Sequence, residues 1–432
     1  MEWESVGQIK SFPLGQHDIA DRLLIPEKLY GRDSACNTLL AAYDRVVATH
    51  KSELVLLSGY AGIGKSSVVH ELHKVIVRPR GIFISGKFDQ HKRDIPYATL
   101  AQAFQELARQ ILNKSEQEII HWRNAILEAL GPNGQLMLNL VPELELVIGK
   151  QPPIPELPPQ EAQNRFEAVL RGFLGAVARK EHPLVLFLDD LQWLDPATLR
   201  LLEQLVTDPN VQHLLLIGAY RDNEVTSHHP LMLTLGAIRK SEAIVREIEL
   251  EPLSLADVNQ LLSDALRCEL AHARPLAKLV HEKTGGNPFF TIQFLTTLAE
   301  EHLLEFEARE AAWRWDLNRI RAKGFTDNVV DLMITKLRRL SALTQEALKQ
   351  LSCLGNSVKI STLLAVHGGS EQEIHSELWE AVRAGLVLRL ADSYTFVHDR
   401  VQEAAYALIP EGERAAVHLR IGRLFVSRTT PE

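Results

Sequence analysis

Cysteine is scarce in this sequence: its 432 residues contain three, Cys36, Cys268 and Cys353. They lie far apart and form none of the closely spaced pairs that hold zinc or mark a redox motif. Such usage is typical of a reducing compartment and argues against a disulfide framework. We therefore expect a cytoplasmic protein without disulfides and without a zinc site.

Long apolar runs are also lacking. No stretch approaches the about 20 residues that span a bilayer. The first residues, Met1-Glu2-Trp3-Glu4, do not have the basic start and apolar core of a signal peptide. We expect no membrane partner.

A surplus of basic residues is missing as well. The net charge is −8, and the pI is near 6.1. Residues 321–432 contain 14 Lys and Arg against 13 Asp and Glu, a net charge of +1. Domains that bind DNA usually carry a clear basic surplus, so we expect no nucleic-acid partner.

A strand, a glycine-rich turn and a helix are predicted in succession over residues 54–67. The apolar run Leu54–Leu57 leads into Gly59, and after four residues comes Gly64-Lys65-Ser66. This spacing is that of a phosphate-binding loop. Backbone N–H groups of such a loop cradle phosphates, a lysine reaches the β- and γ-phosphates, and a hydroxyl holds Mg²⁺. An ordinary glycine-rich turn is the alternative.

We assign the phosphate contacts to the whole loop, with Lys65 also catalytic and Ser66 also a metal ligand. The loop residues are Gly59, Ala61, Gly62, Ile63, Gly64, Lys65, Ser66 and Ser67.

Further core strands are indicated by continuous apolar runs at 81–86, 184–188, 214–219 and 243–250. Strands without alternation, separated by helical segments, are typical of a parallel sheet that is covered on both faces. We therefore predict an α/β fold with a helical insertion at about residues 97–180.

Two carboxylates end the run at 184–188. We predict that Asp189 completes the Mg²⁺ shell and that Asp190 orients or deprotonates the attacking water. Two aspartates that only cap the next helix are the alternative. Arg221 ends the following strand and could sense the γ-phosphate; a surface ion pair is its alternative.

After Pro252 the pattern becomes mainly helical, with a hairpin predicted over 387–397 around Asp392-Ser393. Helices followed by such a hairpin indicate a winged helix-turn-helix.

The ordered set of these motifs resembles STAND-class signalling ATPases, which are relatives of AAA+ proteins. The set comprises Tyr30-Gly31-Arg32-Asp33, the phosphate loop, Leu188-Asp189-Asp190, Arg221, Gly286-Asn287-Pro288 and Val397-His398-Asp399. Gly86–Gln90 (GKFDQ), 188–195 (LDDLQWLD) and 396–406 (FVHDRVQEAAY) are similar to the ATPase module of bacterial multidomain sensor kinases.

The resemblance implies five parts. They are an N-terminal arm (1–28), an AAA+-like P-loop NTPase domain (29–252), a helical lid (253–326), a winged-helix domain (327–410) and the start of a helical segment (411–432). In the resembling family further domains follow, so we expect this chain to be a fragment or a shortened relative.

The resemblance also implies nucleotide contacts outside the loop. Leu29, Tyr30 and Gly31 match the segment that contacts adenine, and Pro288 matches the lid proline that packs against the base. His398 matches a histidine that reaches the β-phosphate of ADP, although Val397 replaces the usual methionine. A helix break at Pro288 and a structural role for His398 are the alternatives.

The leading hypothesis is a slow ATP hydrolase that is closed with ADP and open with ATP, with Mg²⁺ as cofactor. Expected partners are kinase or other signalling domains, in cis or in trans, and a nucleotide-dependent homo-oligomer. A nucleotide-controlled transcription regulator and a scaffold that binds nucleotide without hydrolysis remain alternatives.

Overall fold

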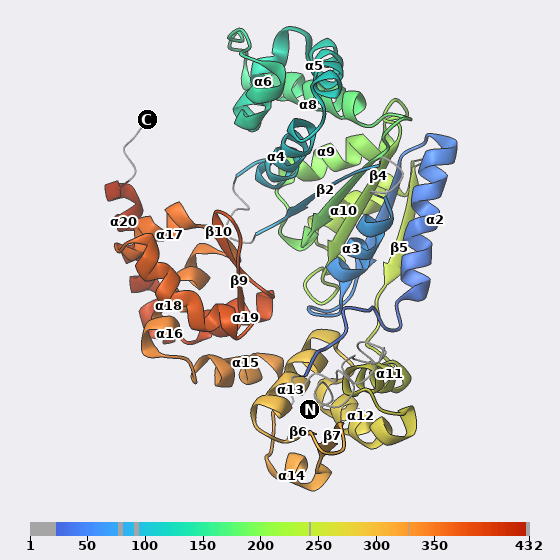
Figure 1. Ribbon diagram of the computed structural model, residues 1–432. Coiled ribbons are helices and arrows are strands. Elements are labelled where there is room, and N and C mark those ends of the chain that lie inside the picture. The colour runs from blue at the N-terminus through green and yellow to red at the C-terminus, as the bar shows by residue number, and fades with distance from the viewer. Residues whose placement is uncertain (1–22, 77–80, 90–94, 242, 327, 429–432) are drawn as a thin grey trace, which may run out of the picture. The chain divides into compact units, whose positions relative to one another are not determined.

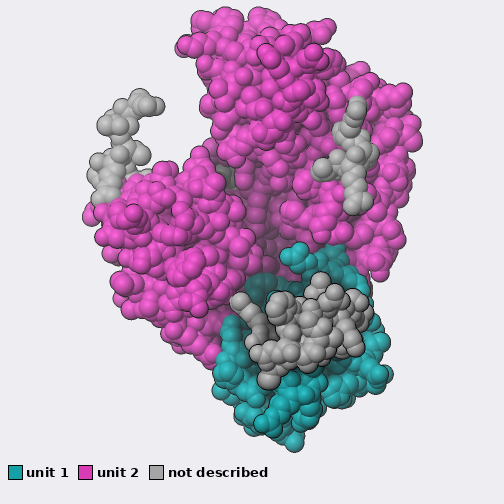
Figure 2. Space-filling view, viewed as in Figure 1, with its two compact units in different colours: residues 1–30, 253–328 teal, residues 31–252, 329–432 magenta. Residues whose placement is uncertain are grey.

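The computed structural model describes residues 23–76, 81–89, 95–241, 243–326 and 328–428. The chain forms two compact units (Figure 2): residues 1–30 with 253–328, and residues 31–252 with 329–432. Most of the predicted N-terminal arm, residues 1–22, lies outside the described residues.

The first part of the larger unit is built on a five-stranded sheet whose pairs are all parallel (Figure 1). The strands lie in the order β2-β3-β4-β1-β5. Their bounds are β1 Glu53–Ser58, β2 Ile82–Lys87, β3 Leu184–Asp189, β4 Leu214–Tyr220 and β5 Ile244–Glu249. The predicted α/β fold with a parallel sheet is confirmed.

Both faces of this sheet are covered because alternate side chains of the strands are buried on opposite sides. Leu54, Leu56, Leu184 and Leu186 join the large core beneath the helices that follow β2 and β3. Val55, Leu57, Val185 and Phe187 are equally buried on the other face, where α2 and α3 pack together. The helices of this part are α2 Asp33–Thr49, α3 Lys65–Ile76, α4 Ala98–Leu112, α5 Glu116–Leu130, α6 Gly134–Leu140, α7 Glu145–Ile148, α8 Pro159–Val177, α9 Pro196–Thr207 and α10 Pro230–Ile238.

Helices α4 to α8 lie between β2 and β3, in the range where the sequence predicts a helical insertion. Prolines between residues 152 and 159 keep the stretch before α8 out of a helix, and Pro159 begins α8 as its first helical residue.

The second part of the larger unit, residues 329–432, combines six helices with a small antiparallel sheet in the order β8-β10-β9. The predicted hairpin is confirmed as β9 and β10, whereas the assignment to a winged helix stays a prediction. The bounds are α15 Val329–Leu337, α16 Ala342–Leu354, β8 Ser357–Lys359, α17 Ile360–His367, α18 Glu371–Arg383, β9 Val387–Arg389, β10 Ser393–Phe396, α19 Asp399–Ala407 and α20 Arg414–Arg428.

The smaller unit is helical apart from one hairpin, as the sequence predicts. Its elements are α11 Leu255–Leu266, α12 Leu270–Thr284, α13 Pro288–Glu300, β6 Leu304–Glu307, β7 Ala312–Trp315 and α14 Leu317–Ala322. The Tyr30 hydroxyl donates to Asp264 in α11 at 2.8 Å, which ties residues before Gly31 to this unit.

Candidate functional site

The loop between β1 and α3 has the backbone of a phosphate cradle. Gly59, Gly62 and Gly64 have φ values of 141°, 78° and 98°, a region that side chains strongly disfavour. A Cβ on Gly59 would also lie 2.8 Å from the carbonyl oxygen of Leu250. The backbone of the loop can therefore take this course only when residue 59 is a glycine.

Lys65 begins α3 and its amine is turned back over the loop. Nζ donates to the carbonyl oxygens of Gly59 at 2.7 Å and Tyr60 at 3.0 Å. Burial lowers the pKa of Lys65, while Asp189 and Asp190 act in the opposite direction. The ammonium is thus held at the mouth of the loop, where an anion would replace two neutral carbonyl partners.

Arg32 is a loop contact that the sequence reasoning missed. It is 7% exposed, and its guanidinium donates to the carbonyl oxygen of Ile63 at 2.9 Å. It immediately follows Gly31, whose φ is 61°. The Tyr-Gly-Arg-Asp motif was the available signal, but nothing in its pattern linked the arginine to the loop.

The predicted metal ligands meet at the carboxyl ends of β1 and β3. The Ser66 hydroxyl donates to Oδ2 of Asp189 at 2.7 Å, and the backbone N–H of Asp190 donates to Oδ1 at 2.9 Å. Burial, together with the charge of Asp190, raises the pKa of Asp189. A cation between Ser66 and Asp189 would relieve both effects, so these residues fit Mg²⁺.

The ligand set agrees with that ion. Among the described residues no group of three or more His, Cys, Asp and Glu side chains is arranged to hold a metal. Magnesium commonly takes one or two protein oxygens and completes its shell with phosphate and water. Ser66 and Asp189 are sufficient for a site of that kind.

Asp190 is surrounded by donors. Its φ of 57° is left-handed, and Oδ1 accepts from the Gln192 amide at 2.8 Å. Lys87 Nζ lies 3.2 Å from Oδ2, and Arg221 Nε lies 3.3 Å from Oδ1. The predicted general base and the predicted phosphate sensor are therefore ion-paired with each other.

Arg221 directly follows β4, which lies between β1, the strand before the phosphate loop, and β3, the strand that ends at Asp189. Its side chain is 8% exposed, pairs with Glu224 at 2.7 Å and lies over the Trp193 ring at 4.8 Å. Burial opposes its charge, but Asp190, Asp399 and Glu224 outweigh that effect and raise its pKa. The alternative of a surface ion pair does not describe this buried residue.

Lys87 and Arg221 share a second carboxylate, that of Asp399 at the start of α19. Asp399 Oδ1 lies 2.7 Å from Lys87 Nζ, and Oδ2 lies 2.6 Å from Arg221 Nη2. Burial alone would raise the pKa of Asp399, but Lys87, His398 and Arg221 lower it to about 2. A residue of the C-terminal helices thus reaches the carboxyl edge of the sheet.

His398 is the N-terminal cap of α19. Its Nδ1 accepts the backbone N–H of Arg400 at 3.1 Å. Burial lowers the pKa of His398 to about 4, with Lys87 and Arg221 adding to the effect and Asp399 opposing it. The ring is therefore neutral at pH 7, and its contact with a β-phosphate stays a prediction.

Of the remaining predicted nucleotide contacts, Leu29, Tyr30 and Pro288 belong to the smaller unit, whereas Gly31 is the first residue of the larger unit. Tyr30 is buried there, and burial and the bond to Asp264 raise its pKa. Pro288 is the first residue of α13, behind an Asn287 cap that accepts from Phe290 N–H at 3.1 Å. The contacts of Leu29, Tyr30, Gly31 and Pro288 with adenine stay predictions.

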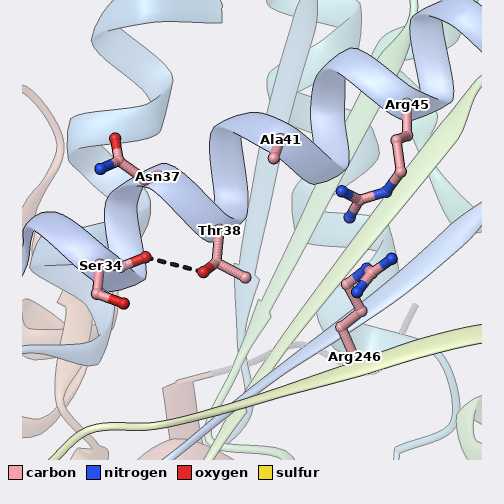
Figure 3. Close-up of a pocket in the computed structure, with 6 residues that line it drawn as sticks. All are labelled: Ser34, Asn37, Thr38, Ala41, Arg45 and Arg246. Carbon is pink, nitrogen blue, oxygen red and sulfur yellow. Dashed lines mark hydrogen bonds between the residues drawn. The ribbon is translucent and has the colours of Figure 1, made fainter.

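An open hollow of about 630 Å³ lies between α2 and β5 and contains two arginines (Figure 3). Arg45 and Arg246 both pair with Glu53, at 2.6 Å and 2.8 Å. Glu53 is 1% exposed. The arginines neutralise a buried carboxylate and hold α2 and β5 to β1, so we assign them no ligand. The lining residues are Ser34, Asn37, Thr38, Ala41, Arg45 and Arg246.

Residues 28–217 match the family model described as the AAA ATPase domain. This match covers the phosphate loop, Lys87 and both aspartates of β3. It confirms the predicted resemblance to P-loop ATPases of the AAA+ type.

Curated relatives include signalling kinases. Hybrid signal transduction histidine kinase G of Dictyostelium discoideum is 28% identical over 523 aligned residues, with 98% of this chain and 15% of that protein covered. Histidine protein kinase 1 of Candida albicans is 26% identical over 194 residues, with 41% of this chain and 8% of that protein covered. This chain therefore spans a small part of each relative's length.

Similar solved structures include a STAND protein with a tetratricopeptide repeat sensor from Pyrococcus horikoshii (TM-score 0.47, 13% identity, 95% of this chain and 47% of that chain). A Walker-type ATPase of Pyrococcus abyssi has a TM-score of 0.41 and 15% identity, with 90% of this chain and 99% of that chain covered. The Orc1 protein of Aeropyrum pernix, solved in complex with DNA, has a TM-score of 0.39 and 17% identity, with 90% and 96% covered.

Proposed function

We propose that this chain, which carries an AAA ATPase domain, is the nucleotide-operated switch of a signalling protein. It binds and slowly hydrolyses ATP, is closed with ADP and open with ATP, and regulates signalling domains in cis or in trans. One observation carries the proposal: Asp399, from the C-terminal helices, pairs with Arg221 beside the aspartates of β3. The state of the phosphate site is thereby linked to the C-terminal helices.

Each residue has a distinct role in the proposal. The loop from Gly59 to Ser67 presents its N–H groups to the phosphates, and Lys65 exchanges its two carbonyl partners for phosphate oxygens. Ser66 and Asp189 hold Mg²⁺, which when bound neutralises charge on the phosphates. Arg221 stabilises the transferred phosphoryl group.

Asp190 accounts for slow turnover. A general base needs a free lone pair within reach of the attacking water. Three donors, Gln192, Lys87 and Arg221, already face the Asp190 carboxylate. These donors take three of the about four lone-pair positions of the carboxylate, so the attacking water can reach Asp190 only at the one position that is left.

His398 can shift the equilibrium between the closed and open forms but cannot invert it alone. A hydrogen bond to a charged group contributes about 1.5–3 kcal/mol, whereas inverting a two-state equilibrium from 1:99 to 99:1 takes about 5.5 kcal/mol. The pairs of Asp399 and the packing of the C-terminal helices must supply the rest.

The test is nucleotide binding and turnover in purified protein. With Mg²⁺ and ATP at about 100 times its dissociation constant, the wild type should gain about 2.7 kcal/mol of stability and release phosphate. Lys65→Ala should lose both effects, because the phosphates then lose their cation. Lys74→Ala removes a lysine from the exposed side of the same helix and should match the wild type.

Asp190→Asn separates binding from chemistry. It should retain ATP and lose turnover, because an amide does not accept the proton. A wild-type protein without any ATP-dependent thermal shift contradicts the proposal. Binding without phosphate release above an Asp189→Ala control would favour the non-hydrolysing scaffold.

A further inference from the structure

Lys87 and Arg221 form a receptor for one anion with two oxygens. They stand at the carboxyl ends of β2 and β4, on the two sides of β3. Each Asp399 oxygen meets a different cation, Oδ1 with Lys87 at 2.7 Å and Oδ2 with Arg221 at 2.6 Å. A lysine and an arginine that bind a carboxylate at such distances can also bind a phosphate, because both anions offer charged oxygens to their N–H donors.

This cation pair lies next to the phosphate loop. Arg221 ends the strand between β1 and β3. Asp190, which touches both cations, directly follows the aspartate that bonds Ser66. Burial is the main cause of the lowered pKa of Lys65, and the charge of Arg221 adds to it. Arg221 is thus within electrostatic range of the lysine that would hold the β- and γ-phosphates.

We propose that Asp399 is an internal mimic of the terminal phosphate: its carboxylate occupies the Lys87–Arg221 receptor and sets the preference of the site for ADP over ATP. The inference rests on the proposed function. It adds Lys87 to the site as a second cation for the γ-phosphate, and it makes Asp399 the residue that determines specificity between the two nucleotides.

Charge makes the two occupants exclusive. A carboxylate and the terminal phosphate of ATP are both anions, and like charges a few ångströms apart repel each other. Asp190 already provides one carboxylate at the pair. ADP leaves Asp399 in position because it has no third phosphate, whereas ATP must displace it.

The surroundings leave room for that displacement. Lys87, Arg221, Trp193 and Asp399 line a cavity of about 860 Å³ between α4 and the C-terminal helices. The Lys87 and Asp399 side chains are 36% and 19% exposed. Both can separate into a solvated space without opening the core of the sheet.

The test compares affinities for ADP and for a non-hydrolysable ATP analogue, each with Mg²⁺. Asp399→Asn should bind the analogue about 10- to 100-fold more tightly than the wild type, which is the range of one lost charge-assisted contact. Its affinity for ADP should stay within about two-fold of the wild-type value. ADP has no third phosphate that competes with Asp399 for the two cations, so removing the charge of Asp399 does not change ADP binding. Asp392→Asn removes the same charge from the exposed turn after β9 and should match the wild type.

Lys87 is tested in the Asp399→Asn background. There Lys87→Gln should weaken binding of the analogue by about ten-fold and leave ADP unchanged, because only the third phosphate needs the amine. Equal changes for both nucleotides, or no change for either, would overturn the inference.

Trp193 provides a readout in the wild type that does not depend on the folding of a variant. Its ring lies under the Arg221 guanidinium, so its emission should change with the analogue and not with ADP, and Trp193→Phe should remove that change. Identical responses to both nucleotides contradict the mimic. A wild type that binds neither nucleotide overturns the proposed function along with it, whereas normal binding with an unaltered ratio in Asp399→Asn overturns the mimic alone.

Discussion

Single residues at the sheet edge have more partners than their expected roles need. Arg221 contacts Asp190, Glu224 and Asp399 and also covers the Trp193 ring. Each partner restricts the guanidinium, so its position is set by several elements at once. A group fixed in this way responds to a change in any one partner, which is useful in a sensor.

His398 makes the stability of the protein depend on pH. Burial lowers the pKa of His398 to about 4; Asp399 opposes this effect, and Lys87, Arg221 and Arg400 add to it. The ordinary value is about 6.5. As the pH falls below 6.5, the unfolded chain takes up this proton first, so stability is lost between about pH 6.5 and pH 4.

We expect the free energy of unfolding to fall by about 2 kcal/mol because of this histidine when the pH is lowered from 7 to 5. In His398→Asn the cap acceptor is kept and the titration is removed, so the loss should be smaller by that amount. Urea unfolding at the two pH values measures the difference. Asp399 does not affect this comparison. Its pKa is lowered to about 2, so the stability that its carboxylate contributes is lost only below about pH 3.8. Parallel pH profiles for both proteins would show that His398 is not buried as described.

The sequence identified Lys65, Ser66, Asp189 and Arg221 because each follows a recognisable strand or loop. It did not reveal the pairs of Lys87, since the partner Asp399 is 312 positions away and no periodicity relates them. The position of Lys87 at the end of a core strand was the one available signal.

At the scale of elements, strand identity was predictable and strand order was not. Continuous apolar runs mark each buried strand, but the same runs allow many orders in the sheet. Packing places β4 between β1 and β3, and this order brings Arg221 between the phosphate loop and Asp189.

Helix α9 shows how a local bond supports the site. Asp195 caps it by accepting the N–H groups of Ala197 at 3.1 Å and Thr198 at 2.8 Å and the Thr198 hydroxyl. Asp195 is 4% exposed. The helix start is thereby held just after Asp189-Asp190.

Asp195→Ala should lower the free energy of unfolding by about 1–2 kcal/mol, the usual cost of losing a helix cap. Asp195→Asn keeps an acceptor at the same place and should lose clearly less. Thermal unfolding of both variants beside the wild type provides the measurement. Equal losses would mean that the charge, rather than the cap, stabilises this helix.

At the scale of the whole molecule, the described residues contain no helix that is long and apolar enough to cross a membrane. The five predicted parts correspond to two compact units, because residues 329–432 group with the sheet domain and residues 253–328 group with residues 1–30. Contacts between distant segments decide this grouping, and local sequence patterns do not report them.

The proposed switch should be visible in the hydrodynamic behaviour of the entire chain. We expect a larger mass or a larger Stokes radius with a non-hydrolysable ATP analogue than with ADP, because displacement of Asp399 frees the C-terminal helices. Analytical ultracentrifugation with each nucleotide measures this, and Lys65→Ala should show no difference. An identical profile with both nucleotides in the wild type would contradict a switch of this kind.

The distance along the chain between Arg221 and Asp399 has a consequence for synthesis. On the ribosome, Asp399 is added 178 residues after Arg221, which at about 5–20 residues per second takes roughly 10–35 seconds. During that interval the ATPase domain has both of its cations but not yet the carboxylate that pairs with them. If Asp399 acts as proposed, a nascent chain could bind ATP before this carboxylate has been translated, and the first nucleotide that a newly made molecule carries would differ from the one that it later prefers.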